Sequence, residues 1–410
     1  MDKTRIILIT VSFPFGKGEA SFIMPELPYL LQSFDVTFVS RNTKDEQTTN
    51  LPEEVEVVRY PASNMSAVSF IKGLPRLLNK AVIREMFKVK SLSQLIGTVK
   101  FVLRGADIAR YLNKMRRQYN QPVIYYTYWN DYAAYGVSRF CRKNGDKAIS
   151  RIHGGDLYLR PTNKYFLPFK AEIARNLDKM VFISHEGRNY FINTYKPNNE
   201  DNLTVCYMGT ENKLGVGFGS KDDVLRIVSL SNVTFGKRVD LIAKALTLID
   251  DVKIEWVHFG DGEEMPKLKE AVNDLDKKDN IKYSLSGYVS NSEVKSYFAG
   301  NPVDLLVNVS YSEGLPISMV EAASFGIPII GTDVGGVREV ATSENGFLLN
   351  RDFEVEELAD LLVKYYNMPA SKKESVRQAS RHLWENRFVA GDSYLDFTEM
   401  LKGLQCLHQA

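Results

Sequence analysis

The sequence has few cysteines, no long apolar run and almost no net charge. Its three cysteines lack the spacing of metal ligands, which argues against a disulfide framework or a zinc site and favours a reducing compartment. No stretch approaches the roughly 20 apolar residues that a membrane-spanning helix needs. A formal net charge of +2 gives no overall case for nucleic-acid binding. We therefore expect a soluble, cytoplasmic protein that binds no nucleic acid.

The first apolar run, Ile6–Val11, follows basic residues and in that respect resembles a secretory signal. It is short, however, and leads into Ser12-Phe13-Pro14 without a small-residue cleavage site. We therefore interpret it as a buried first β-strand.

Short apolar runs alternate with helix-length segments along both halves of the chain. Strands that are apolar throughout and joined by helices are typical of a parallel sheet covered on both faces. In the first half the predicted strands are Arg5–Val11, Val36–Ser40, Val55–Arg59, Val123–Tyr126, Ala148–Ile152 and Lys179–Ile183, with helices at Phe22–Gln32 and Tyr132–Lys143. In the second half they are Leu225–Leu230, Lys253–Phe259, Ile281–Leu285, Asp304–Val309 and Pro328–Thr332, with a last helical segment at Ser371–Gly403.

The break between the two patterns lies at 211–223, which is rich in glycine and charge and lacks periodicity. A chain of 410 residues is long enough for two cores. We therefore predict an α/β protein of two doubly wound domains, at 1–210 and 224–385, joined by this linker. A C-terminal helix at 386–410 is expected to pack back on the N-terminal domain. Ligands of such sheets bind outside the carboxyl ends of the strands.

The most informative stretch is 308–336, with the sequence NVSYSEGLPISMVEAASFGIPIIGTDVGG. It predicts a strand, a loop, a helix, a second strand and a glycine loop. Pro316 suits the first turn of the helix and Gly326 its end. The N–H groups that begin a helix have no partner within it and carry partial positive charge, so this helix start is a candidate anion site.

Two carboxylates, Glu313 and Glu321, are separated by seven intervening residues in this stretch. One could meet a sugar beside bound phosphates and the other a pair of hydroxyls further along the helix. Alternatively, Glu313 is a partner of the helix dipole and Glu321 lies on a solvated helix face. The local pattern leaves both interpretations open.

The stretch resembles the signature of the family 4 glycosyltransferases of GT-B fold (glycosyltransferase group 1), in its S-E-G-x-P variant. Further segments resemble that family in the same order: Ile227–Leu246, Val257–Glu263, Gly287–Val294 and Val334–Gly346. In the first half, Phe15–Glu19 stands where the family has a glycine loop, which includes Gly16, and His153-Gly154 where it has an acceptor-side histidine. The resemblance covers nearly all of the C-terminal domain and implies two Rossmann-like domains facing a central cleft.

The resemblance also implies residue roles in binding a nucleoside-diphosphate sugar. Lys237 would pair with the donor diphosphate. Glu313 and the N–H groups of Gly314 and Leu315 would contact the transferred sugar and the distal phosphate. Glu321 would accept hydrogen bonds from the ribose hydroxyls. His153 would approach the transferred sugar from the other side of the cleft, with Asp156 nearby on the acceptor side.

One position departs from the family. Many relatives have an arginine five residues before the lysine as a second phosphate clamp, and here that position is Asn232. An amide cannot replace a bidentate guanidinium. Either another cation supplies the charge, with Arg238 the nearest candidate, or the donor binds more weakly.

Each of these residues also has a purely structural interpretation. Lys237 and Arg238 could be solvated residues at a helix start. His153 could be a satisfied loop histidine, Asp156 a helix cap, and Gly16 a turn glycine without a ligand.

The implied reaction is a retaining glycosyl transfer, in which a nucleoside diphosphate departs from an oxocarbenium-like centre. The growing charge can be neutralised by a metal or by fixed cations and dipoles. The one Asp-x-Asp triplet, Asp274-Leu275-Asp276, lies in a polar run typical of a solvated helix end. We therefore expect a metal-independent enzyme without a cofactor. A sugar-nucleotide epimerase and a non-catalytic sugar-nucleotide-binding subunit are the alternatives.

The stretch 72–117 is strongly basic. Lys72, Arg76, Lys80, Arg84 and Lys88 recur every four residues, and only Glu85 and Asp107 oppose the excess. Many apolar residues lie between them, Pro75 suits a helix start, and Ser91 or Ser93 suits the cap of a second helix. A basic amphipathic helix is typical of a membrane-surface element. We expect this face to dock on an anionic membrane and to present the enzyme to a polyprenyl-linked glycolipid or another glycan acceptor. Alternatively, its cations are merely solvated.

Overall fold

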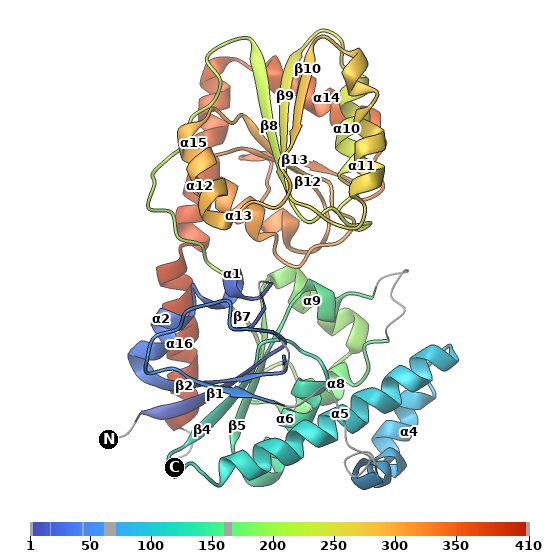
Figure 1. The fold of residues 1–410 in the computed structure, drawn as a ribbon, viewed down its shortest axis with the longest axis vertical. Helices are drawn as coiled ribbons and strands as arrows, with labels where there is room; N and C mark the ends of the chain where they lie inside the picture. Colours follow the sequence, from blue (N-terminus) through green and yellow to red (C-terminus); the bar gives the residue numbers. More distant parts are fainter. Residues whose placement is uncertain (1–2, 17, 43–44, 61–70, 160–165, 407–410) are drawn as a thin grey trace. The chain divides into compact units, whose positions relative to one another are not determined.

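The computed structural model describes residues 3–16, 18–42, 45–60, 71–159 and 166–406. The chain forms two compact units, one of Met1–Cys206 with Tyr394–Ala410 and one of Tyr207–Ser393. Each unit contains one parallel sheet with helices on both of its faces (Figure 1).

The N-terminal unit has a seven-stranded sheet in the order β3-β2-β1-β4-β5-β6-β7, and every pair of neighbours is parallel. Its strands are β1 (Thr4–Thr10), β2 (Phe34–Ser40), β3 (Glu56–Arg59), β4 (Val123–Thr127), β5 (Lys147–Ile152), β6 (Lys179–Phe182) and β7 (Leu203–Val205). The strand order reverses between β1 and β4, so the loops that follow these two strands diverge and leave room for a ligand.

The helices of this unit differ widely in length. They are α1 (Ala20–Ile23), α2 (Leu27–Ser33), the 3₁₀ helix η1 (Leu74–Leu78), α4 (Lys80–Met86), α5 (Leu92–Arg116), α6 (Tyr132–Asn144), α7 (Gly154–Leu157), α8 (Lys170–Asn176), α9 (His185–Tyr195) and α16 (Ala390–Cys406). The side chain of Ser91 caps α5, as the sequence predicts. Helices α5 and α6 pack closely because Gly136 lies against Gly105, where an added Cβ would be 2.3 Å from the Gly105 carbonyl oxygen.

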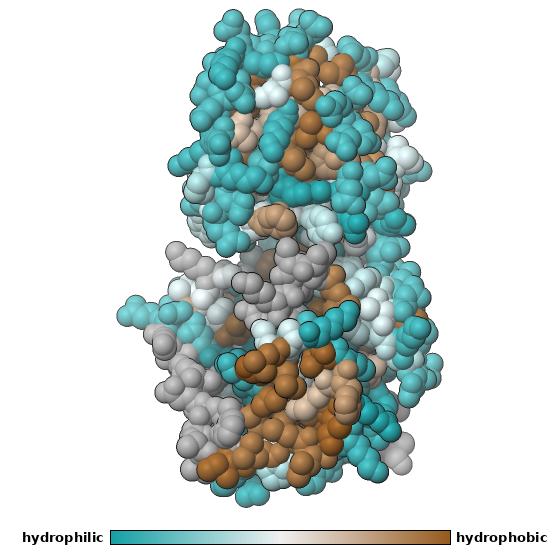
Figure 2. Space-filling model, turned by 90° about the vertical axis from the view of Figure 1, so that its right-hand side faces the viewer, coloured by the Kyte–Doolittle hydropathy of each residue, from teal (hydrophilic) through white to brown (hydrophobic). Residues whose placement is uncertain are grey.

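The last helix, α16, packs on the N-terminal sheet through Phe397, Leu401 and Leu404. None of the described helices is both long and apolar enough to cross a membrane. Large apolar side chains do gather at the surface of the N-terminal unit, on the face that Figure 2 shows.

A buried ion pair lies in the core of the N-terminal unit. Arg151, on β5, donates from Nη1 to Oε2 of Glu26 at 2.5 Å, and the two side chains are 0% and 2% exposed. The guanidinium also lies 4.5 Å from the ring centre of Phe397, so α16 helps to enclose it. Burial disfavours the charged form of Glu26 and raises its pKa, although the charge of Arg151 opposes this shift.

The C-terminal unit has a six-stranded parallel sheet in the order β10-β9-β8-β11-β12-β13. Its strands are β8 (Val224–Leu230), β9 (Lys253–Phe259), β10 (Ile281–Leu285), β11 (Leu305–Asn308), β12 (Ile329–Thr332) and β13 (Gly346–Leu349). Its helices are α10 (Asp240–Thr247), α11 (Met265–Val272), η2 (Leu275–Lys277), α12 (Asn291–Gly300), α13 (Ile317–Ser324), η3 (Gly335–Glu339), α14 (Val355–Tyr366) and α15 (Ala370–Arg387). The order reverses between β8 and β11.

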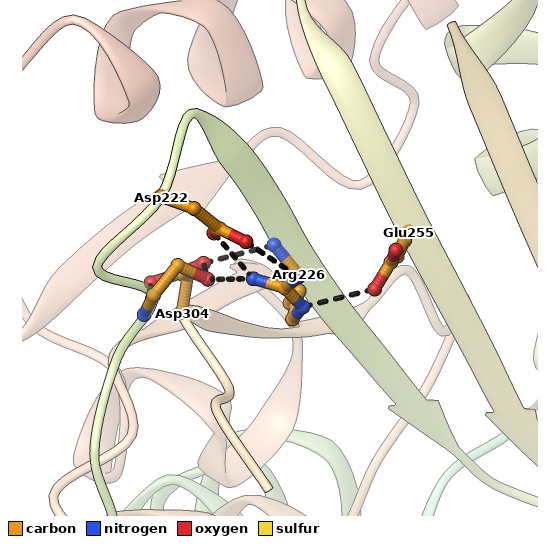
Figure 3. A network of polar contacts seen from close by, with 5 residues as sticks. Asp222, Arg226, Glu255 and Asp304 are labelled. Atoms are coloured by element: carbon orange, nitrogen blue, oxygen red, sulfur yellow. Dashed lines mark hydrogen bonds and ion pairs between the residues drawn. The ribbon is translucent and has the colours of Figure 1, made fainter.

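A polar network fixes the segment that leads into this sheet (Figure 3). Asp304, just before β11, accepts hydrogen bonds from the backbone N–H groups of Ser220 and Arg226 at 2.9 and 2.8 Å. The Arg226 guanidinium pairs with Asp222 at 2.6 Å and with Glu255 on β9 at 2.9 Å. The network lies at the amino ends of the strands, away from the ligand-binding edge, so its role is structural.

The eleven predicted strands are all present, and two short edge strands, β7 and β13, are not among the predictions. Two predicted helices are each divided. The segment Phe22–Gln32 spans parts of α1 and α2, and Ser371–Gly403 spans α15 and α16. The unit boundaries fall after Cys206 and after Ser393 rather than at the expected 210 and 385.

The buried ion pair gives a stability prediction. Glu26→Ala leaves Arg151 charged and unpaired, and we expect it to lower the free energy of unfolding by about 3–5 kcal/mol. Glu26→Leu combined with Arg151→Met is expected to cost less than Glu26→Ala alone. Glu385→Ala, which removes the exposed partner of Arg381, is the control and should cost less than about 1 kcal/mol. Chemical denaturation measures these three variants against the parent, and a Glu26→Ala protein as stable as the control would contradict this account.

Candidate functional site

The carboxyl ends of β8 and β11 carry the donor-side candidates. The loop after β8 contains Lys237, and the loop after β11 contains Glu313. The two loops are joined by their backbones, because the N–H of Tyr311 donates to the Gly236 carbonyl at 2.8 Å. The next loop is held equally close, since a Cβ on Gly260, whose φ is 143°, would lie 1.8 Å from the Ser231 carbonyl oxygen. These contacts fix the loops at the point where the strand order reverses.

Lys237 and Glu313 form an ion pair. Lys237 Nζ donates to Glu313 Oε1 at 2.5 Å, and Asn308 Nδ2 lies 3.3 Å from the same oxygen. Burial by itself would raise the pKa of Glu313, but the charge of Lys237 and the hydrogen bonds from Lys237, Ser310 and Asn308 outweigh it and lower the pKa. Glu313 is therefore an anion that Lys237 holds in place.

The helix that follows, α13, begins at Ile317, three residues beyond Gly314. Pro316 stands at its N-cap, and Gly314 and Leu315 precede it. Within the described part of the chain, the backbone N–H groups of Gly314 and Leu315 have no hydrogen-bond partner. The helix start therefore offers unused donors and partial positive charge beside the Lys237 ammonium, an arrangement suited to a phosphate.

Glu321 lies one turn into α13 and contacts α12 rather than Lys237. Its Oε1 accepts from Asn291 Nδ2 at 2.5 Å and lies 3.7 Å from Lys295 Nζ. Burial raises its pKa, and Lys295 and Asn291 oppose that shift. The side chain is thus buried, with polar neighbours on one side. This excludes the interpretation that Glu321 lies on a solvated helix face. Asn291 follows Gly287 in a segment with family resemblance, whereas no sequence signal pointed to Lys295.

The departure at Asn232 is not compensated by Arg238 in this structure. Asn232 is exposed. The Arg238 guanidinium instead donates from Nε to the Val309 carbonyl at 2.8 Å and lies 5.3 Å from the ring centre of Phe353. Arg238 therefore stabilises the loop after β11, and its backbone adopts a φ of 52°, which is unusual for a residue other than glycine. Lys237 is the cation that the structure places beside Glu313.

In the N-terminal unit the loop after β1 is organised by one carboxylate. Glu19 accepts from the backbone N–H groups of Ser12 and Phe13, at 2.5 and 2.8 Å, and from the indole of Trp129 at 2.5 Å. Gly16 closes the turn by donating to the Ser12 carbonyl at 3.0 Å. An added Cβ on Gly16 would lie 2.7 Å from the Ser12 side chain, so a glycine is required for packing alone.

His153 stands at the carboxyl end of β5 and is buried against aromatic rings. Its ring centre is 4.4 Å from that of Trp129 and 5.1 Å from that of Tyr128. Neither ring nitrogen has a hydrogen-bond partner among the described residues. Burial, with the charge of Arg151, lowers the pKa of His153 to about 3, so the imidazole is neutral near pH 7. A neutral ring with two unused nitrogens can bind a hydroxyl but cannot act as an acid.

Asp156 joins the loops after β4 and β5. It accepts from the backbone N–H groups of Asn130 and His153, each at 2.6 Å, so it closes the start of α7. Burial raises its pKa to about 6, and Lys170 opposes the shift. Lys170 is itself buried and donates to the carbonyl and side-chain oxygens of Asn130. Asp156 therefore positions His153, and Lys170 is a buried partner that no sequence motif indicated.

The Asp-x-Asp triplet does not form a cluster of metal ligands. Asp274 pairs with Lys277 at 2.7 Å, and Asp276 accepts from the Tyr283 hydroxyl at 2.9 Å. In the part of the chain that the structure describes, no three His, Cys, Asp or Glu side chains are grouped as a metal site would require.

Comparison with known proteins identifies the C-terminal unit. Residues 216–383 match the family described as glycosyl transferases group 1. The C-terminal unit belongs to the group 1 glycosyltransferases. Its residues Lys237, Glu313 and Glu321 all lie within the matched range, and so do the free N–H groups before α13.

Curated proteins similar to this group 1 glycosyltransferase unit are named as glycosyltransferases or as a glycolipid synthase. The chain is 25% identical to the amylovoran biosynthesis glycosyltransferase AmsK of Erwinia amylovora over 44% of its own length and 45% of that protein's. The chain is 27% identical to an uncharacterized glycosyltransferase of Haemophilus influenzae, over 51% of its own length and 56% of that protein's. The chain thus spans about half the length of these two relatives. Identity to the alpha-monoglucosyldiacylglycerol synthase of Streptococcus pneumoniae is 29% over 80% of this chain and 70% of that protein.

Solved structures extend the likeness to both units. The sucrose-phosphate synthase of Thermosynechococcus elongatus aligns with a TM-score of 0.74 at 15% identity, over 99% of this chain and 100% of that one. Anabaena HepE in complex with UDP and glucose aligns with a TM-score of 0.68 at 15% identity, over 98% and 100%. The group 1 glycosyltransferase unit and the N-terminal unit therefore have the GT-B fold, as the sequence predicts.

The lowered pKa of His153 gives a pH prediction. Because its pKa is about 3 in the folded protein and about 6.5 when unfolded, only the unfolded chain takes up this proton at mildly acidic pH, and stability is lost as pH falls below about 6.5. Between pH 7.5 and pH 5 this loss amounts to about 2 kcal/mol. We expect His153→Gln to remove it, as measured by chemical denaturation at both pH values.

Asp156 changes the stability in the opposite direction over this pH range. Its raised pKa makes the folded protein bind the extra proton between about pH 4 and pH 6, so this residue adds stability as the pH falls. The comparison must therefore be between variant and parent at each pH. His382→Gln, at an exposed position on α15, is the matched control. If the free energy of unfolding of His153→Gln falls between the two pH values as much as that of the parent, His153 is not the buried neutral base described here.

Proposed function

We propose that the protein is a retaining, metal-independent glycosyltransferase that moves a sugar from a nucleoside-diphosphate sugar to a glycan or lipid-linked acceptor. The observation that carries the proposal is the Lys237–Glu313 ion pair at the start of α13, beside the unused N–H groups of Gly314 and Leu315. A diphosphate that displaces Glu313 from Lys237 would gain both the ammonium and the helix start.

Each donor-side group then has a distinct role in this proposal. Lys237 and the α13 N–H groups stabilise the diphosphate as its charge grows, which favours the transition state over the ground state. Glu313, once released, accepts hydrogen bonds from the transferred sugar. Glu321 accepts hydrogen bonds from the ribose hydroxyls on the side of its carboxylate that contacts Asn291 and Lys295. UDP is the first nucleotide to test, because a protein of the same fold has been solved with it.

The acceptor hydroxyl needs to lose a proton, and no side chain described here is suited to take it. His153 is a weak base because its pKa is lowered to about 3, and Asp156 is occupied by two backbone N–H groups. We propose that the departing diphosphate oxygen accepts that proton while the new bond forms on the same face of the sugar, which retains the anomeric configuration. His153 offers its neutral ring to a hydroxyl of the transferred sugar.

The acceptor class follows from the relatives rather than from the geometry. Relatives are named for amylovoran and O-antigen biosynthesis and for a glucosyl diacylglycerol. We propose a surface-polysaccharide or glycolipid acceptor of the polyprenyl-linked type, and a cytoplasmic, membrane-peripheral location.

Two substitutions test the donor site. Lys237→Ala should lower kcat more than it weakens UDP binding, since the diphosphate charge grows in the transition state. Glu321→Ala should weaken UDP binding mainly, because the ribose hydroxyls lose a charged acceptor worth about 1.5–3 kcal/mol. Initial rates of UDP release and calorimetric titration of UDP, both in excess chelator, measure the two effects.

Lys267→Ala, on the exposed side of α11, is the matched lysine control and should behave as the parent. Normal turnover in Lys237→Ala would remove the phosphate assignment. Activity that is abolished by chelator and restored by manganese would overturn the metal-independent mechanism.

A further inference from the structure

The N-terminal unit contains a buried lysine at a position where local physical chemistry disfavours one. Lys170 is the first residue of α8 and is only 3% exposed. A cation at the start of a helix meets the partial positive charge of the unpaired N–H groups there, and burial removes the water that would stabilise it. Phe169, the residue before it, has a φ of 63°, a left-handed conformation that is rare for a large side chain. Departures of this kind from local preference are expected at functional sites.

The ammonium of Lys170 binds the loop that follows β4. It donates to the backbone carbonyl of Asn130, and to the side-chain oxygen of the same residue at 2.8 Å. Asn130 is fully buried, and its Nδ2 donates to the Ser150 hydroxyl on β5 at 3.0 Å. Strand β4 is one of the two between which the order of the N-terminal sheet reverses. Lys170 therefore ties α8 to the edge of the sheet where ligands bind.

The same loop is connected to His153 through Asp156. The two carboxylate oxygens of Asp156 accept from the backbone N–H groups of Asn130 and His153, each at 2.6 Å. Burial raises the pKa of Asp156 to about 6, and the charge of Lys170 opposes this shift and favours the carboxylate. Lys170 thus acts on His153 in two ways, through its hydrogen bonds to Asn130 and through the charge that it places near Asp156.

An ion pair fixes the other side of the loop. Asp131 pairs with Arg41 Nη1 at 2.6 Å and caps α6 by accepting from the Ala133 N–H at 2.8 Å. Arg41 Nε also donates to the carbonyl of Thr10, the last residue of β1, at 3.0 Å. The loops after β1, β2, β4 and β5 are therefore joined in one polar network. Arg41 stays charged at any working pH, whereas burial lowers the pKa of Lys170 to about 8, with Asp156 and Asp131 opposing the shift.

Other charged or titratable side chains face Lys170 from the elements packed around it. They line a cavity of about 630 Å³ together with Lys170, and they are Arg84, Glu85 and Lys88 on α4, Glu172 and Arg175 on α8, and Tyr195 and Lys196 at the end of α9. Both carboxylates of this set are paired, Glu85 with Lys88 and Glu172 with Arg139. Burial raises the pKa of Tyr195. Lys170 is therefore the group that we expect to change its charge near pH 8.

We propose that Lys170 is a positioning residue: in its charged form it holds the loops after β4 and β5, and with them His153, in the arrangement that turnover requires. The part that concerns turnover rests on the proposed function, whereas the loop positioning does not. Because Lys170 loses its proton near pH 8, turnover should fall as the pH rises through 8. UDP binding should not depend on Lys170, since the proposed donor site lies in the C-terminal unit.

Hydrogen exchange of the full chain tests the positioning without any need for activity. Lys170→Gln removes the charge, and we expect at least tenfold faster exchange at pH 7 in peptides that cover 128–131 and 152–156, with no change in the C-terminal unit. Lys114→Gln, at an exposed position on α5, is the matched control and should exchange as the parent does. Thermal unfolding and calorimetric UDP binding show whether each variant is folded.

The pH profile of kcat for UDP release from UDP-glucose tests the link to turnover. In the parent and in Lys114→Gln, kcat at pH 9 should be about tenfold lower than at pH 7, since only about a tenth of Lys170 is then charged. Lys170→Gln should have at least tenfold lower kcat than the parent at pH 7 and no further fall up to pH 9. Lys170→Arg keeps a charge throughout this range, so it should keep more of the parent's kcat than Lys170→Gln and lose the alkaline fall.

Two outcomes would overturn the proposal while leaving the donor site untouched. The first is loop exchange in Lys170→Gln that matches the control. The second is an alkaline fall in kcat that is the same in Lys170→Gln and in the parent. The proposed function fails differently: a parent that releases no UDP from any UDP-sugar would count against it, and faster loop exchange in Lys170→Gln would still support the positioning role.

Discussion

The ion pair between Lys237 and Glu313 is the interaction on which the proposed donor site depends. Each partner lies in the loop that follows a strand, and the two strands are those between which the order of the C-terminal sheet reverses. The pair keeps a buried carboxylate charged and holds an ammonium at the start of α13 before any ligand arrives. A diphosphate would meet a preformed site, because the backbone contacts between the neighbouring loops already fix both side chains.

In the N-terminal unit the loops after the strands are also held in place, but by carboxylates that accept hydrogen bonds from backbone N–H groups. Glu19 binds the backbone of the loop after β1, and Asp156 binds the loops after β4 and β5. Their carboxylates serve as internal supports. His153 is one of several buried side chains among the described residues whose polar atoms have no hydrogen-bond partner, and its burial beside Arg151 keeps it neutral. Such buried, unpaired atoms in a native structure call for a partner, and a ligand is the natural one.

Much of this fold could be predicted from the sequence, because its strands are apolar throughout and separated by clear helices. The strands β7 and β13 escaped prediction since they are three and four residues long and lie at sheet edges, where few apolar residues are needed. The resemblance located Lys237 and Glu313, but it could not show that they pair with each other. Nor could it show that Arg238 turns to the Val309 carbonyl, because that contact depends on a left-handed backbone conformation at Arg238.

The most direct test of the central claim is the calorimetric affinity of UDP for Glu313→Gln compared with the parent. If Glu313 and the diphosphate compete for Lys237, removing the charge of Glu313 should tighten the binding of bare UDP, and the gain should disappear when Lys237→Ala is added. UDP affinity that is unchanged by Glu313→Gln, or a gain that persists without Lys237, would contradict the assignment of this ion pair to the donor diphosphate.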